Sequence, residues 1–381
     1  LWPIGNCQVS ALIDRAGRFV WGCVPRVDGD PLFVALVAGD AADDPAGWGL
    51  WAIDLEDRTL TEQHYIRNTP ILVSRHTDVR GGVVEVIDFC PRFRRLGRSY
   101  RPVAFARIVR PVSGAPRIRV RLRPTHDWGV ASVAAPGGSN HLRYSLDGIA
   151  LRLTTTAPVG MVQEERLFRV EHPLHFFLGP DEAFSTDVAQ TVEQMLTYTT
   201  AEWQEWVRGL AIPLEWQEVV IRAAIGLKLC QHEETGAIVA ALTTSIPEHA
   251  GSQRNWDYRY CWIRDAYYTV QALNRLGALD VLEAYLSYLR NIVDGARGGH
   301  IQPLYGVLGE AELPESAAFR LSRHGAGPRR EPRGSPGAAR RLWPDHPVLD
   351  AGLRRPAAVP PGKHCRLRGA GAGGRARLAE P

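Results

Sequence analysis

The chain has 381 residues, 45% of them hydrophobic and 23% charged, which is ordinary for a globular protein of more than one domain. No apolar stretch reaches the roughly 18 residues of a transmembrane helix, so none is expected. The net charge of +4 does not indicate an anionic partner, because residues 321–381 carry 13 Arg and Lys against 4 Asp and Glu, while the remainder carries 32 against 37.

Residues 1–190 are predicted to form an antiparallel β-sandwich. Two hairpins are indicated, one of residues 9–14 and 19–23, the other of residues 71–77 and 83–89. Residues 118–122 alternate apolar side chains with Arg, as a strand with one exposed face does. Many short strands without a helical period between them favour a sandwich. Further strands are predicted at residues 104–109, 141–144, 149–153 and 175–178.

The spacing of apolar residues changes from two to 3.6 near residues 190–200, which predicts a boundary between a β domain and a helical domain. A linker helix is assigned to residues 191–212, with Thr199, Thr200 and Glu202 resembling a helix start. Three more helices are predicted at residues 216–230, at residues 265–276 with a cap at Gly277, and from about residue 280.

The composition changes after residue 316. From Leu321 onward, 41 of 61 residues are Arg, Ala, Gly or Pro, and Ile, Phe, Tyr, Thr, Asn, Gln and Met are absent. Such bias indicates a disordered tail, but natural disordered tails favour Glu, Ser, Gln and Lys. A GC-rich gene read out of frame is the alternative. Residues 317–381 are therefore assigned as an out-of-frame, disordered tail, and the chain is expected to be truncated after about residue 315.

The number and spacing of the cysteines indicate the cellular compartment in which the protein is expected. The six cysteines form no CxxC pair and no metal-ligand spacing, which is typical of a reducing compartment. The first ten residues, LWPIGNCQVS, lack the basic start and apolar stretch of a secretory signal. We therefore expect a cytoplasmic protein without a metal site. The cysteines are Cys7, Cys23, Cys90, Cys230, Cys261 and Cys365.

One short segment carries a specific signal. Residues 257–265 read DYRYCWIRD, which resembles the DYxYxWxRD signature of glycoside hydrolase family 15, the glucoamylase- and trehalase-like enzymes. Residues 235–248, TGAIVAALTTSIPE, and residues 301–310, IQPLYGVLGE, are also similar to the family, as is the opening IGNCQVSALIDRAGRFVWGCVPRVD of its bacterial branch. The resemblance covers residues 4 to about 315. It implies that an N-terminal β domain precedes the first part of an (α/α)6 barrel, here residues 213–316.

The chemistry of this segment suits a neutral sugar. Arg264 offers a rigid fork of donors and Asp265 a pair of acceptors, which together can bind adjacent hydroxyls. Tyr258 and Trp262 offer flat walls for the C–H faces of the ring. The resemblance implies that Arg264 and Asp265 hold the non-reducing terminal glucose where cleavage occurs. Asp257 is interpreted as a structural hydrogen-bond partner, and an isolated Arg-Asp pair is usually only a surface pair.

No catalytic residue is assigned. The resemblance implies inverting, exo-acting cleavage of α-glucosidic bonds by two glutamates, whose carboxyl groups lie about 6.5–9.5 Å apart in inverting enzymes. In the family both follow the third barrel repeat. Here only Glu331 and Glu380 lie beyond Glu315, without a matching context, and Glu248 inherits no role.

Three functions follow from this. The intact gene is expected to encode a hydrolase of α-glucosides, whereas this polypeptide is expected to be inactive, a sugar-binding remnant. The third function, nucleic-acid binding by the Arg-rich tail, is disfavoured because Trp343 is its only aromatic residue. The expected partner is an α-glucoside or oligosaccharide, with no cofactor, nucleic acid or membrane involved. Maltooligosaccharides, dextran-type linkages and trehalose all stay open, as does the oligomeric state.

The hypothesis that the tail is read out of frame can be tested at the gene. Codons can be chosen for Arg320 to His324 that, read one nucleotide later, give Gly-Tyr-Arg-Gly-Met, a run that the family carries. The same displacement recovers a second family-like run from residues 340–352. Sequencing the gene across codons 310–325 is expected to reveal a gained or lost nucleotide. An unbroken frame that continues as printed would show that the tail is genuine.

Overall fold

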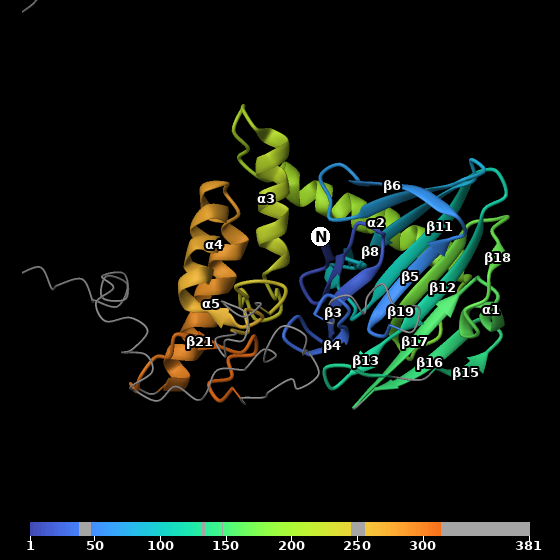
Figure 1. Ribbon diagram of the computed structural model, residues 1–381. Helices are drawn as coiled ribbons and strands as arrows, with labels where there is room; N and C mark the ends of the chain where they lie inside the picture. The colour runs from blue at the N-terminus through green and yellow to red at the C-terminus, as the bar shows by residue number, and fades with distance from the viewer. Residues whose placement is uncertain (38–46, 132–133, 147, 245–255, 297, 314–381) are drawn as a thin grey trace, which may run out of the picture. The chain divides into compact units, whose positions relative to one another are not determined.

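The computed structural model describes residues 1–37, 47–131, 134–146, 148–244, 256–296 and 298–313. Within these ranges an antiparallel β-rich region is followed by a few helices, as predicted (Figure 1). The assigned tail, residues 317–381, and Glu248 lie outside the described residues. None of the helices in the described ranges is long and apolar enough to cross a bilayer.

The first sheet has seven strands, all with antiparallel neighbours. Its first hairpin matches the prediction, with a turn at Gly17, whose φ of 77° suits glycine. The strands lie in the order β1 (Trp2–Gly5), β2 (Ser10–Ile13), β3 (Phe19–Val24), β5 (Leu50–Leu55), β12 (Arg117–Arg123) and β18 (Phe168–Arg169), with β4 (Asp30–Phe33) also paired to β3.

The second sheet has eight strands, again antiparallel. It contains the second predicted hairpin and the strands predicted at residues 104–109, 141–144, 149–153 and 175–178, whereas the strand predicted at residues 118–122 is β12 of the first sheet. Its order is β15 (Ala134–Gly138), β16 (His141–Leu146), β17 (Ile149–Thr155), β19 (Leu174–Pro180), β11 (Phe105–Ser113), β8 (Val83–Phe89), β7 (Leu72–Asp78) and β6 (Arg58–Tyr65).

The two sheets share one hydrophobic core. Aromatic rings bridge them, because Phe19 of β3 lies 6.0 Å from Phe105 of β11, and Trp51 of β5 lies 6.4 Å from Phe176 of β19. This arrangement of two antiparallel sheets around a common core is that of a β-sandwich.

A charge lies inside this core. The guanidinium of Arg107, on β11, pairs with Asp88 of β8 at 2.7 Å, and neither side chain is exposed. Arg107 also donates across to the first sheet, to the carbonyl oxygens of Trp51 at 2.7 Å and Gly17 at 2.6 Å. A buried charge is tolerated only when it is paired and hydrogen-bonded in this way, so Arg107 ties the two sheets together.

Helix α2 (Val188–Arg208) connects the β region to the helices that follow it. Val188, Val192 and Met195 cover the outer face of the second sheet, whereas Trp203 and Val207 enter a second core shared with the later helices. The helix start expected at Thr199 is wrong. Asp187 caps the helix twelve residues earlier, by accepting a hydrogen bond from the backbone N–H of Gln190 at 2.8 Å.

The predicted helices after α2 are confirmed. Helix α4 (Ile263–Arg275) is followed by Gly277 at a φ of 79°, and a short link leads into α5 (Leu279–Ala296), which lies beside α4 (Figure 1). Their second core includes Leu12, Trp21 and Cys23 from the first sheet. The helices are α3 (Gln217–Leu229), α4 (Ile263–Arg275) and α5 (Leu279–Ala296). The smaller elements are α1 (Val159–Gln163), β9 (Phe93–Arg95), β10 (Arg98–Tyr100), β13 (Thr125–His126), β14 (Val130–Ala131), β20 (Cys261–Trp262) and β21 (Leu304–Tyr305).

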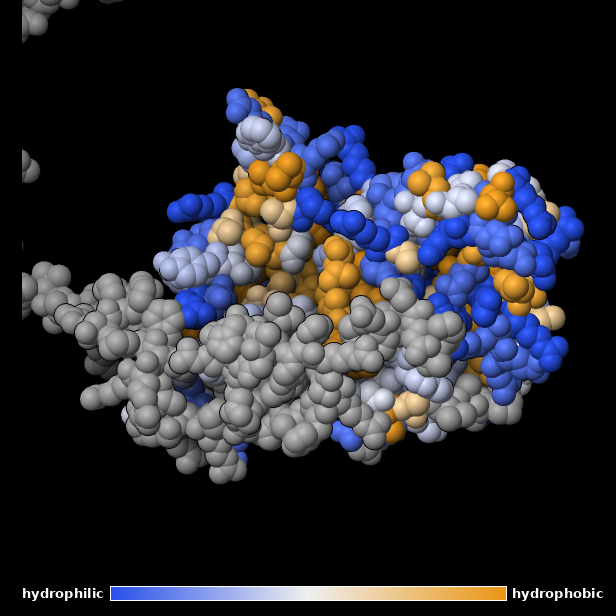
Figure 2. Space-filling model, viewed as in Figure 1, coloured by the Kyte–Doolittle hydropathy of each residue, from blue (hydrophilic) through white to orange (hydrophobic). Residues whose placement is uncertain are grey.

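These helices also carry exposed apolar side chains. Figure 2 shows apolar surface over α3, where Val219 is 64% exposed. Tyr267 and Tyr268 of α4 are exposed as well, as are Leu286 and Val293 of α5. Helix faces of this kind usually mark an interaction surface.

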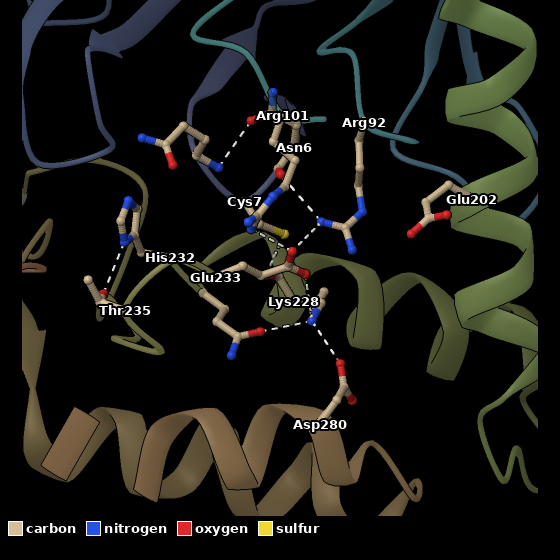
Figure 3. Close-up of polar contacts among 12 residues, drawn as sticks. Asn6, Cys7, Arg92, Arg101, Glu202, Lys228, His232, Glu233, Thr235 and Asp280 are labelled. Carbon is tan, nitrogen blue, oxygen red and sulfur yellow. Dashed lines mark hydrogen bonds and ion pairs between the residues drawn. The ribbon is translucent and has the colours of Figure 1, made fainter. Parts of the chain in front are cut away.

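A cluster of charges links the β region to the helices (Figure 3). Glu233, which follows α3, lies 2.8 Å from Arg92, 2.6 Å from Arg101 and 2.8 Å from Lys228. Lys228 also lies 3.1 Å from Asp280 of α5. Burial acts to raise the pKa of Glu233, but the charges of Arg92 and Lys228 outweigh it and hold this pKa well below its usual range. Glu233 is therefore ionised at the centre of a joint between four parts of the chain.

We predict that Glu233→Gln lowers the free energy of unfolding by about 3 kcal/mol at neutral pH, because it leaves buried cations without their counter-charge. The folded-state pKa lies below the ordinary value of 4.5, so the carboxylate stabilises the fold above pH 4.5 and loses this effect as the pH falls further. Denaturant unfolding at neutral and acidic pH should show the variant and the unmodified chain converging in acid.

The matched control is Glu85→Gln, which breaks a half-exposed pair with Arg75 at 3.3 Å. Such a pair contributes about 0–1 kcal/mol. Equal stability of the Glu233 and Glu85 variants would contradict the structural importance of the cluster.

Candidate functional site

The segment of residues 256–266 runs from a short strand directly into a helix. Strand β20 pairs with β21 through Cys261 opposite Tyr305 and Trp262 opposite Leu304. Helix α4 begins at the next residue, Ile263, whose backbone N–H donates to the carbonyl oxygen of Pro303 at 3.0 Å. Arg264 and Asp265 therefore occupy the first turn of α4, where unpaired backbone N–H groups favour an acidic side chain.

Asp257 and Arg259 fix this segment from inside. Their side chains form a bidentate pair at 3.0 Å and 2.7 Å, with both groups almost fully buried. The backbone N–H of Arg259 and the indole N–H of Trp262 also donate to Asp257, at 3.0 Å and 3.1 Å. Burial acts to lower the pKa of Arg259, but the charge of Asp257 outweighs it, so the guanidinium stays protonated. Asp257 is thus the structural hydrogen-bond partner that the sequence indicates.

The structure brings the four predicted sugar-binding residues together. Arg264 contacts Asp265 with its Nη2 at 2.9 Å from Oδ2, and the two side chains are 42% and 35% exposed. The Arg264 guanidinium lies 5.9 Å from the Trp262 ring, whose centroid lies 6.2 Å from that of Tyr258. Tyr258 is half-buried, whereas Trp262 is only 7% exposed and packs among apolar neighbours. Tyr258 is therefore the more accessible aromatic wall.

This arrangement can bind a ligand rich in hydroxyl groups. Within the described ranges, Oδ1 of Asp265 has no hydrogen-bond partner, so it can accept one from a ligand. The neighbouring guanidinium can donate to a second oxygen, and the first turn of α4 adds a favourable field for electron-rich groups. Both are charge-assisted hydrogen bonds, the stronger kind in proteins.

Other acidic groups near the segment have structural partners. The Oε2 atom of Glu310 accepts a hydrogen bond from the backbone N–H of Leu308 at 3.0 Å, and Oε1 lies 3.7 Å from Arg26. No cluster of three or more His, Cys, Asp or Glu side chains suited to a metal occurs within the described ranges.

Arg259 was not predicted as a site residue, because the signature DYxYxWxRD leaves position 259 unspecified. Arg259 has partners far away in the sequence, on β3 and in the loop between β3 and β4. The only local signal was its spacing, since Asp257 and Arg259 alternate with Tyr258 and Tyr260.

Comparison with known proteins shows which family the segment is similar to. The family described as Glycosyl hydrolases family 15 matches residues 216–325, which include α3, the DYRYCWIRD segment, α4 and α5. Through these residues the chain is similar to glycosyl hydrolase family 15.

Curated relatives extend this likeness into the β region. A trehalase of Mycolicibacterium smegmatis is 30% identical over 341 residues, covering 84% of this chain and 51% of the relative. Trehalases of Mycobacterium tuberculosis and Thermoplasma volcanium are 28% and 25% identical, covering 84% and 82% of this chain and 50% of each relative. Coverage above 80% necessarily includes much of the β-sandwich. The chain spans about half the length of the curated relatives it matches.

Proposed function

We propose that this chain carries the sugar-binding part of an inverting, exo-acting α-glucosidase of the glucoamylase and trehalase type. The observation that supports this most directly is the half-exposed Arg264 and Asp265 pair in the first turn of α4, within the residues that match the family. A buried ion pair behind it holds the segment in place, as a preorganised binding site requires.

The proposed binding mode uses one acceptor and one donor. Oδ1 of Asp265 accepts a hydrogen bond from one hydroxyl of the terminal glucose, and the Arg264 guanidinium donates to the oxygen of a neighbouring hydroxyl. Tyr258 covers one face of the sugar ring, and Trp262 supports Arg264 and Tyr258 from beneath. These four residues form the proposed substrate-binding site.

We infer that α3, α4 and α5 belong to the first part of an (α/α)6 barrel, within residues 213–316. The division proposed for the rest is a β-sandwich domain of residues 1–190 and a linker of residues 191–212. The short connection between α4 and α5, and the exposed apolar side chains on all three helices, support a larger helical assembly.

Cleavage requires a general acid and a general base. Asp257 is committed to Arg259, and Glu310 holds a turn, so neither is proposed for such a role. We therefore propose that the chain as printed binds an α-glucoside without hydrolysing it. The intact gene would supply the two missing carboxylates.

The thiols support a cytoplasmic location. Within the described ranges Cys7, Cys23, Cys90, Cys230 and Cys261 are free thiols, and four of them are buried. Burial raises the pKa of Cys7 and Cys23 to about 11, which makes them poor nucleophiles. Unpaired thiols used as core residues are typical of a reducing compartment.

We predict that Asp265→Asn weakens the binding of maltose or trehalose about tenfold or more, because it replaces a charge-assisted hydrogen bond by a neutral one. Titration calorimetry on the full chain measures the effect. The matched control is Glu218→Gln, which removes the first-turn acid of α3. Unchanged affinity in the Asp265 variant would remove the proposed site.

Hydrolysis gives a separate prediction. The chain as printed should release no measurable glucose from maltose, maltooligosaccharides or trehalose, since each missing acid or base is worth about 10²–10⁴-fold. Restoring the frame and the downstream sequence should bring activity back, and Asp265→Ala in that protein should reduce it severely. Glucose release by the printed chain would show that the catalytic acids lie within it.

A further inference from the structure

Arg259 connects the sugar-binding segment to the β region. Besides Asp257, its Nη1 donates to the carbonyl oxygen of Gly29 at 2.6 Å and to the Cys23 sulfur at 3.4 Å. The guanidinium also lies 5.7 Å from the Trp21 ring and 4.8 Å from the Trp128 ring. These partners lie on β3, in the loop between β3 and β4, and in the turn between β13 and β14, all in the β region.

The socket for this guanidinium includes Trp128, whose position is fixed by hydrogen bonds within the β region. Trp128 is presented by a tight turn between β13 and β14, in which Asp127 and Trp128 have φ values of 44° and 57°. Such conformations cost free energy in residues other than glycine and persist only where the surroundings enforce them. Asp30 of β4 does so here, since its carboxylate accepts the backbone N–H groups of Asp127 at 2.5 Å and Trp128 at 3.3 Å.

On the other side, the contacts lead to the proposed site. The Asp257 carboxylate accepts hydrogen bonds from the Arg259 side chain, and the Asp257 carbonyl oxygen accepts one from the indole N–H of Trp262. The Trp262 ring lies beside the guanidinium of Arg264, which contacts Asp265. An unbroken series of close contacts therefore runs from Trp128 and Gly29, through Arg259 and Asp257, to the first turn of α4.

We propose that Arg259 is a positioning residue, through which the β-sandwich sets the geometry of Arg264 and Asp265. This inference rests on the proposed sugar-binding function. The signature DYxYxWxRD leaves position 259 unspecified, so the family resemblance assigns this residue no role. The planar fork of Arg binds Asp257 with two nitrogens, reaches Gly29 with the third, and packs against two indoles, which a Lys ammonium cannot reproduce.

The test uses Arg259→Lys and Trp128→Ala, with Trp128→Phe as the conservative variant. Trp128 lies far from the sugar-binding residues in sequence and is only half-buried, so its replacement alters the socket without emptying the core. The control is Asp88→Asn, which breaks the buried pair with Arg107 inside the sandwich and leaves the Arg259 socket intact. Any effect of general destabilisation appears in this control.

The first measurement is hydrogen exchange at the backbone amides of Trp262 and Ile263 in the sugar-free chain. Exchange is expected to rise at least tenfold in the Arg259→Lys and Trp128→Ala variants, and to keep its original rate at these amides in Trp128→Phe and Asp88→Asn. The second measurement is the affinity for maltose or trehalose, which should fall about tenfold in the first two variants only.

The two measurements separate the proposals. Faster exchange in the first two variants supports the positioning role even if the unmodified chain binds no sugar, a result that would overturn the proposed function alone. Unchanged exchange and unchanged affinity in both variants would overturn the positioning role, while loss of binding in Asp265→Asn would still support the function. If Arg259→Lys fails to fold, Trp128→Ala decides the matter.

Discussion

The buried guanidinium of Arg107 sets how the two sheets pack. A charge with no access to water has to be compensated by groups at fixed distances, and here these are Asp88 on one sheet and carbonyl oxygens of the other. Strand β3 contributes to two separate sites. Phe19 packs beneath Arg107, whereas Trp21 and Cys23 enter the core shared with the helices and border the second buried guanidinium, Arg259. Arg107 thus holds the two sheets together, and Arg259 joins the sugar-binding segment to the β region.

Apolar packing and charge act together where the β region meets the helices. The core that the β region shares with the helices buries apolar surface, including the side chains of Trp203 and Trp21. Apolar burial of this kind has no preferred direction. The ion pairs of the Glu233 cluster are directional, because Arg92, Arg101 and Lys228 each contact the same carboxylate at 2.6–2.8 Å. Removing one member of such a cluster is strongly destabilising, because the other buried charges then lack a counter-charge. The cluster joins α3 and α5 to the loops that carry Arg92 and Arg101.

Local patterns predicted much of this fold, and distant contacts explain what was missed. The hairpins around Gly17 and Gly81 and the helices α3 to α5 were predicted because turn residues and apolar spacing are short-range signals. Strand β6 was missed because most of its side chains are exposed or half-buried and show no apolar alternation. The four sugar-site residues lie together because they are close in sequence, whereas the partners of Arg259 in the β region lie more than 100 residues away. The binding role, the barrel and the frameshift stay predictions.

The single helix α2 has a consequence for synthesis on the ribosome. Its first half completes the outer face of the second sheet, and its second half presents Trp203 and Val207 to elements that are translated later. The sandwich can therefore close as soon as this helix leaves the exit tunnel. The outer side of β2 and β3, with Leu12, Trp21 and Cys23, then serves as a finished template on which α3, α4 and α5 assemble in the order in which they emerge.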